Sequence, residues 1–227
     1  ALDELRTTIG FGLRMIFFII LPAMVGLILL RYPIVHLVFE HGTFTQADTL
    51  ATATALLCYA VGLWAFAGVR IIVSAFYSLQ DTRTPAVTAG IAVMANILLS
   101  LWLMTLLGAA GLALATALAA MLNGSILVGV LHRRLGRVDW GAILRSAGRV
   151  LGACIPMVAI CLWIAGAAMW TEGGDWILKI AVLFGGIGLS ITAYLGVHLV
   201  LGSEELDVVL GMVKRKLGRV ARKFGAG

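Results

Sequence analysis

One of the few charged side chains inside an apolar stretch of this sequence is Arg70, in the segment 50–78. Ser78 ends that segment eight residues later, so on a helix Arg70 lies roughly 12 Å from the segment's end. Such an arginine either extends its long side chain back to the polar end of the segment or faces a hydrated cavity. In a cavity, its guanidinium would bind an anion such as a pyrophosphate. Both interpretations stay open.

A second set of polar side chains lies on the next two apolar segments. Asn96 and Ser100 are four residues apart, so they share one face of a helix, and Thr116 lies on the neighbouring segment. Oxygen ligands of this kind suit a small hard cation, although interhelical hydrogen bonds are the commoner use of such residues. The ordinary packing interpretation also applies to Asn123 and His198.

The connection 80–85 carries Asp81 and Arg83, which either line a cavity or join two helix ends. Sequence motifs of hydrolases, zinc proteases and nucleotide-binding enzymes are absent, and the acidic residues lie almost entirely in loops and tails. We therefore expect no enzyme activity, no cofactor and no firm metal site.

The composition indicates which elements must position these residues. Of the 227 residues, 61% are hydrophobic and 12% are charged, with a mean hydropathy of +1.04. A single soluble core could not bury that much apolar surface. About six apolar segments approach or exceed the ~20 residues that cross a bilayer as a helix. They are 10–31, 50–78, 85–107, 109–131, 150–170 and 176–201. The sequence predicts an all-α polytopic membrane protein.

Positive charge indicates the orientation, because cytoplasmic loops collect Lys and Arg. With a cytoplasmic N-terminal end, nearly all of the 17 Lys and Arg fall inside; only Arg31 and Lys179 fall outside, and Arg70 lies within a span. Both ends are therefore predicted to be cytoplasmic. The tail 202–227 has a basic amphipathic pattern that suits anionic lipid headgroups, so the net charge of +6 requires no nucleic acid. The basic residues of this tail are Lys214, Arg215, Lys216, Arg219, Arg222 and Lys223.

Local signals predict several element boundaries. Thr45 and Asp48 have the spacing of a capping box, and Thr84 before Pro85 is typical of an N-cap, so helices should begin near 46 and 85. The connection 108–111 is so short that the helices on either side of it must be antiparallel neighbours.

Further signals concern helix packing and the membrane surface. Gly111, Ala115 and Ala119 form a small-residue stripe for close helix packing. Pro22 and Pro156 should kink their helices and free backbone carbonyls that other groups must satisfy. Residues 138–149 are too short and too charged to span, so we expect an interfacial segment on the cytoplasmic side.

Five stretches of the sequence form a recognisable set in order and spacing. They are VFEHGTFTQADT at 38–49, YAVGL at 59–63, SAFYSLQDTRTP at 74–85, GLALATALAAMLN at 111–123 and LHRRLG at 131–136. Together these stretches resemble the MurJ/MviN family of the multidrug/oligosaccharidyl-lipid/polysaccharide exporter superfamily. The third stretch is the most specific. The resemblance implies helices nine to fourteen of a fourteen-helix transporter, with four helices of the C-terminal lobe in 1–137 and two additional helices in 150–201.

The resemblance also implies a function. It implies a flippase that moves lipid II, a polyprenyl-pyrophosphate-linked glycan, across the bacterial inner membrane, with the missing N-terminal lobe as a partner and a groove for the lipid tail between the last two helices. The arginines that grip the pyrophosphate in the family lie mostly in the missing part. Two alternatives remain, namely a sister exporter of another polyprenyl-linked glycan and a non-transporting six-helix scaffold.

Overall fold

The described part of the chain folds into seven long helices that stand side by side, followed by a short helical segment at residues 205–211. The computed structural model describes residues 2–40, 42–136, 140–167, 170, 175–203 and 205–211. The helices are α1 (Leu2–Phe39), α2 (Gln46–Val61), α3 (Leu63–Ser78), α4 (Arg83–Leu107), α5 (Ala109–Leu135), α6 (Trp140–Ala165) and α7 (Trp176–Val200). The described residues contain no strand, so the all-α prediction is confirmed.

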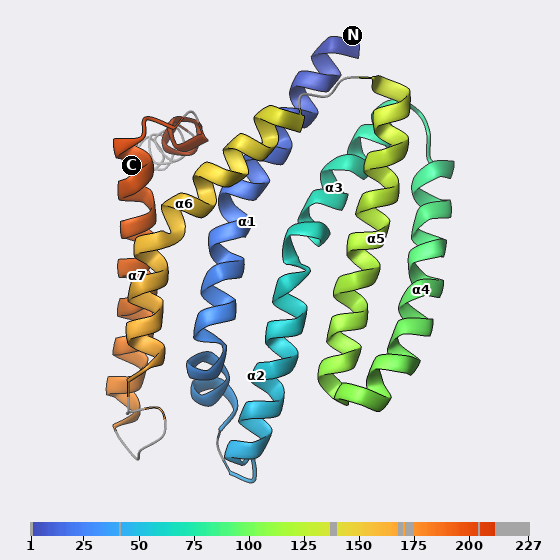
Figure 1. Ribbon diagram of the computed structural model, residues 1–227. Coiled ribbons are helices and arrows are strands. Elements are labelled where there is room, and N and C mark those ends of the chain that lie inside the picture. Colours follow the sequence, from blue (N-terminus) through green and yellow to red (C-terminus); the bar gives the residue numbers. More distant parts are fainter. Residues whose placement is uncertain are drawn as a thin grey trace, which may run out of the picture.

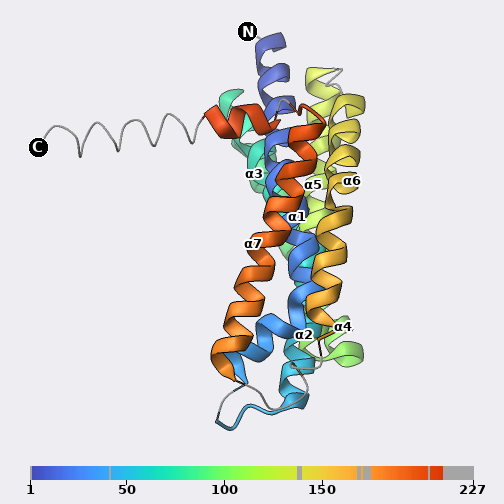
Figure 2. The ribbon, with the colours of Figure 1, turned by 90° about the vertical axis from the view of Figure 1, so that its left-hand side faces the viewer.

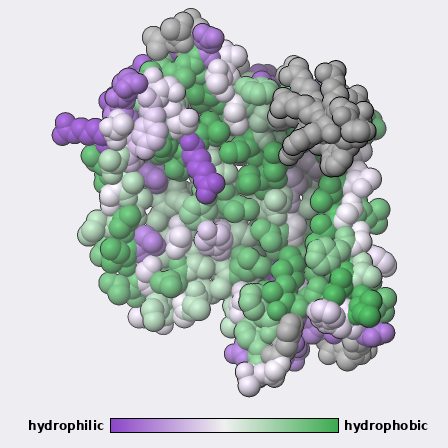
Figure 3. Space-filling view, turned by 180° about the vertical axis from the view of Figure 1, so that it is seen from behind, coloured by the Kyte–Doolittle hydropathy of each residue, from purple (hydrophilic) through white to green (hydrophobic). Residues whose placement is uncertain are grey.

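Six segments of the described chain are long and apolar enough to cross a membrane, because α2 and α3 together form one of them, Gln46–Ser78. Much of their surface faces outward. Only 11% of the most apolar window of α4 is buried, and Trp163 on α6 is 77% exposed. Figure 3 shows hydrophobic residues over much of the middle of one face, with hydrophilic residues more frequent toward its ends. Lipid, or further transmembrane helices, must cover such a surface.

The helices form a slab with α1 near its middle (Figures 1 and 2). On one side of α1 stand α6 and α7, and on the other side stand α2, α3, α5 and α4. One apolar core lies mainly between α1, α6 and α7 and includes Phe18, Met157 and Leu183. The second core joins the first half of α1 to α3, α5 and the start of α6. The slab therefore has two faces on which a site can form.

The predicted start of α2 is confirmed by its cap. The Thr45 backbone N–H donates to the Asp48 carboxylate over 2.9 Å, and the Asp48 N–H donates to the Thr45 hydroxyl over 3.3 Å. The predicted cap of α4 is wrong, because α4 begins at Arg83 and Asp81 accepts hydrogen bonds from both the Thr84 N–H and its hydroxyl. A carboxylate in the turn thus satisfies the free N–H of Thr84 in the first turn of α4.

The span predicted at 50–78 is broken at Gly62, which ends α2 and precedes α3. A Cβ at Gly62 would lie 2.6 Å from the Cβ of Ala117, so the glycine allows the backbone of α5 to come close. On α5, a Cβ at Gly111 would overlap the Leu103 carbonyl of α4, and Ala115 and Ala119 are buried. The predicted small-residue stripe and antiparallel pairing of α4 with α5 are both confirmed.

Residue 150 is not a helix boundary. Residues 140–149 form the first turns of α6 and continue without a break into the apolar part of that helix, while 137–139 lie outside the described residues. Residues 140–149 of the segment expected at the membrane interface are therefore continuous with a long helix. Their position at the membrane surface stays a prediction. The basic tail residues from Lys214 to Lys223 also lie outside the described residues.

Candidate functional site

Several of the polar residues singled out in the sequence lie together in one groove. Arg70 on α3, Asn96 on α4, and Thr116 and Asn123 on α5 line a cavity of about 370 Å³. The other residues that line it are Phe66, Val69, Ala89, Ala92, Val93, Ala119 and Ala120. The groove is mostly apolar, with one cation and three amide or hydroxyl groups. We refer to it as the polar groove.

The hydrogen bonds around the polar groove leave oxygen atoms available to a ligand. The Ser100 hydroxyl donates to Asn96 Oδ1 over 3.3 Å, and the Thr116 hydroxyl donates to the Leu112 carbonyl over 2.9 Å. Each of these hydrogen bonds lies within a single helix, the first in α4 and the second in α5. Asn123 Oδ1 is buried and has no hydrogen-bond partner among the described residues. Buried amides are normally satisfied, so this oxygen has the chemistry to accept from water or a ligand.

Arg70 is exposed within the groove, and its guanidinium offers donors only. It stands two turns from the end of α3, so its side chain can follow the groove either toward that end or toward Asn96. A guanidinium in an apolar-walled groove next to neutral oxygens is a good partner for a phosphate group, because it can form two parallel hydrogen bonds with it.

Asp81 lies in the α3–α4 turn and Arg83 is the first residue of α4, and neither lines the polar groove. The Asp81 carboxylate pairs with Arg134 at the end of α5 over 2.6 Å. Its pKa lies below the usual value of 3.8, chiefly because Thr84 donates hydrogen bonds to it, with a smaller effect from the Arg134 charge. The Arg83 side chain is exposed. The pair that ties helix ends together is therefore Asp81 with Arg134.

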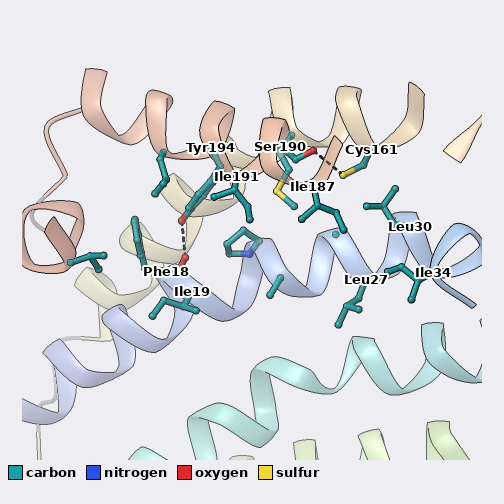
Figure 4. Close-up of a pocket in the computed structure, with 16 residues that line it drawn as sticks. Phe18, Ile19, Leu27, Leu30, Ile34, Cys161, Ile187, Ser190, Ile191 and Tyr194 are labelled. Atoms are coloured by element: carbon teal, nitrogen blue, oxygen red, sulfur yellow. Dashed lines mark hydrogen bonds between the residues drawn. The ribbon is translucent and has the colours of Figure 1, made fainter. Parts of the chain in front are cut away.

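A second groove, of about 460 Å³, runs along α1 between α6 and α7 (Figure 4). Its lining is almost entirely aliphatic or aromatic and includes Ile19, Leu27 and Ile34 of α1 and Ile187 and Ile191 of α7. The polar groups at its wall are occupied. The Cys161 thiol and the Ser190 hydroxyl lie 3.5 Å apart, and the Tyr194 hydroxyl donates to the Phe18 carbonyl over 2.8 Å. We refer to it as the apolar groove.

The Tyr194 hydrogen bond follows from a proline in α1. Pro22 has no N–H, so the carbonyl of Phe18, four residues earlier, lacks its usual helical donor. Tyr194, which comes from α7 and is 4% exposed, supplies that donor. The sequence predicted a freed carbonyl at Pro22, and the structure identifies the group that satisfies it.

A buried polar chain near the far end of the apolar groove was not predicted. Lys179 on α7 is 7% exposed, and its Nζ lies 2.9 Å from His36 Nε2. Because an ammonium only donates, Nε2 must accept and Nδ1 must carry the proton that it shares with Glu40 over 2.7 Å. The Thr49 hydroxyl donates to the same Glu40 oxygen over 2.6 Å. These hydrogen-bonded side chains thus join α7, α1 and α2.

Charge and hydrogen bonding stabilise Glu40 as a carboxylate. Burial acts to raise the pKa of Glu40, but the hydrogen bonds from Thr49 and His36 and the positive charge of Lys179 outweigh it, so the pKa lies below 4.5. In the sequence, the sign of this hydrogen-bonded cluster is Lys179, a lysine in the first turn of an apolar helix. The charge pattern alone places Lys179 only as one of two charges outside the membrane.

A family model described as "Lipid II flippase MurJ" matches residues 2–183 of the chain. The chain is 34% identical over 213 residues to a "Probable lipid II flippase MurJ" of Vibrio cholerae, which covers 91% of this chain and 39% of the relative. It is 31% identical over 209 residues to a protein of the same description from Rhizobium meliloti, covering 87% of this chain and 37% of the relative. The chain thus spans about two fifths of the length of these relatives.

The fold agrees with the sequence comparison. A solved structure described as "Lipid II flippase MurJ, inward closed conformation" superimposes with a TM-score of 0.61 and 23% identity, over 88% of this chain and 41% of that one. The structural match supports the helix arrangement, and the family model covers α1 to α6 and the start of α7. On these matches, the chain belongs to the lipid II flippase MurJ family.

Proposed function

We propose that this chain is the C-terminal part of a flippase that moves lipid II from the inner to the outer leaflet of the bacterial inner membrane by alternating access. The observation that carries the proposal is that a chain of this family has two grooves of opposite character on one slab of helices. An amphiphilic substrate needs a polar site for its headgroup and an apolar site for its chain.

The polar groove serves the headgroup in this proposal. Arg70 contributes positive charge near the pyrophosphate, and the second wall of the cavity comes from the N-terminal lobe of the same protein. Asn96, Ser100 and Thr116 form either a polar packing layer or part of a site for a small cation. Since Ser100 and Thr116 hydrogen-bond within their own helices, their oxygens keep lone pairs for such an ion.

The apolar groove serves the polyprenyl chain. Its lining carries no charged side chain, and its polar groups already hydrogen-bond to protein. A hydrocarbon chain that enters the groove therefore breaks no hydrogen bond of these polar groups. The basic tail lies at the cytoplasmic surface, where it contacts anionic lipids, and both ends of this chain are cytoplasmic.

The test of this assignment is growth of a strain that depends on the full-length protein carrying Arg70 variants. Arg70→Ala should impair growth, because it leaves a pyrophosphate partly uncompensated in a low-dielectric site, and Arg70→Lys should retain part of the activity. Arg83→Ala is the matched control, since Arg83 is an exposed arginine outside the groove.

Membrane abundance of each variant is measured by immunoblot. Full growth with Arg70→Ala at normal abundance would contradict the role in the cavity and leave an arginine that only extends to the membrane surface. A non-transporting scaffold makes a different prediction, because its residue 70 would contact protein. A cysteine at position 70 should then be protected from a soluble thiol reagent, whereas a hydrated cavity leaves it reactive.

A further inference from the structure

A separate short segment of the chain contributes to the lining of the apolar groove at one end. On α1 it runs from Phe18 to Ile34, a helical rise of about 24 Å, and the hydrocarbon layer of a bilayer is about 30 Å thick. At the Phe18 end, Val209 completes the lining. Val209 belongs to the helical residues 205–211, which follow α7 and lie beside Phe18 in Figure 4.

This segment is held firmly by polar contacts. Glu205 is 4% exposed, and its carboxylate accepts a hydrogen bond from the Ser146 hydroxyl of α6 over 2.8 Å. Burial acts to raise the pKa of Glu205, but hydrogen bonds and the positive charges of Arg14 and Arg149 outweigh that effect and lower it. The carboxylate is therefore charged at neutral pH and is attracted to both α1 and α6.

Packing holds the same segment from the other side. Leu206 is 3% exposed within the core between α1, α6 and α7, and Val209, one turn later, packs against that core. Ser203 and His198 lie 2.9 Å apart, oxygen to Nδ1, at the junction with α7. His198 packs edge-on against Phe18 and Tyr194, which line this end of the groove, and the Tyr194 hydroxyl donates to the Phe18 backbone carbonyl.

We propose that residues 205–211 form an end stop for the apolar groove, so that a single polyisoprenoid chain can occupy the groove only as far as Val209. The choice of a polyisoprenoid rests on the proposed function. The stop itself rests on the anchoring of Glu205 and Leu206 and on the position of Val209 in the groove lining. The size of residue 209 then determines how many isoprene units the groove accommodates.

The experiment uses the purified full-length protein and polyprenyl monophosphates of increasing chain length. A ligand that binds the folded state raises the thermal unfolding midpoint, and each further isoprene unit should raise it more while additional apolar surface is buried. We expect this increase to reach a plateau at a defined chain length. Val209→Trp should move the plateau to a shorter chain, and Val209→Met should move it less.

Leu210→Trp is the matched control, because Leu210 is the adjacent residue, is exposed and does not line the groove. Its plateau should stay at the wild-type chain length. Protection that increases without a plateau, or a plateau that Val209→Trp leaves unmoved, would overturn the end stop while leaving the proposed function intact. If no polyprenyl chain protects the wild-type protein, or if only phospholipid acyl chains do, the assignment of the groove to a polyisoprenoid fails as well.

Discussion

At the scale of single residues, the contacts that matter most are those that satisfy polar groups within an apolar environment. A backbone carbonyl without a donor is costly where no water is available. Pro22 creates one such carbonyl at Phe18, and Tyr194 satisfies it from another helix. The hydroxyl of Tyr194 therefore fixes α7 against α1 at the wall of the apolar groove.

Replacing this tyrosine tests the contact. Tyr194→Phe should lower the thermal unfolding midpoint of the full-length protein, because it leaves the Phe18 carbonyl buried without a partner at a cost of about 1–3 kcal/mol. Tyr77→Phe removes the hydroxyl of a tyrosine that is 53% exposed and should have little effect. Equal unfolding midpoints for the two variants would show that the Tyr194 hydrogen bond adds no stability.

Some of these contacts could be predicted from the sequence and others could not. The Pro22 carbonyl could be predicted because a missing N–H depends only on the residue type. The grouping of Arg70 with Asn123 could not, since it depends on how α3, α4 and α5 pack. The contact of Lys179 with His36 and Glu40 could not be predicted, because Lys179 is far from the other two in sequence and a lone lysine near a helix start normally reaches solvent.

At the scale of elements, small residues determine how closely the helices approach. Gly62 ends α2 where the backbone of α5 passes, and Gly111 lets α5 contact the end of α4. The small-residue stripe on α5 was predicted from its spacing, whereas the break at Gly62 was not. A glycine inside an apolar run is common in membrane helices, so only the contact with Ala117 identifies it as a break point.

A methyl group at this break tests the close approach. Gly62→Ala should destabilise the protein by about 1–3 kcal/mol, because the new Cβ would lie 2.6 Å from that of Ala117 and force α2, α3 and α5 apart. Gly90→Ala is the control, since a Cβ at Gly90 on α4 meets nothing within 4 Å. The measurement is the unfolding midpoint of each variant in detergent. A Gly62→Ala protein as stable as Gly90→Ala would mean that the helices part without cost.

At the scale of the whole molecule, the proposed function makes this chain one side of a transport pathway. It spans about two fifths of the length of its relatives, and its polar groove contains one arginine. The membrane fold and the family could be predicted from charge placement, span lengths and short motifs, because each of these features can be recognised within a short stretch of sequence. The apolar groove as a built surface, and the segment that contributes to its lining at one end, required the packing of α1, α6 and α7.

The most direct test of the proposed function is to deplete the full-length protein and follow lipid-linked precursors in each leaflet. We expect lipid II to accumulate in the inner leaflet and its exposure at the outer surface to fall before cell-wall synthesis stops. Accumulation of a different polyprenyl-linked glycan, with lipid II still reaching the outer leaflet at the normal rate, would contradict the lipid II assignment and favour a sister exporter.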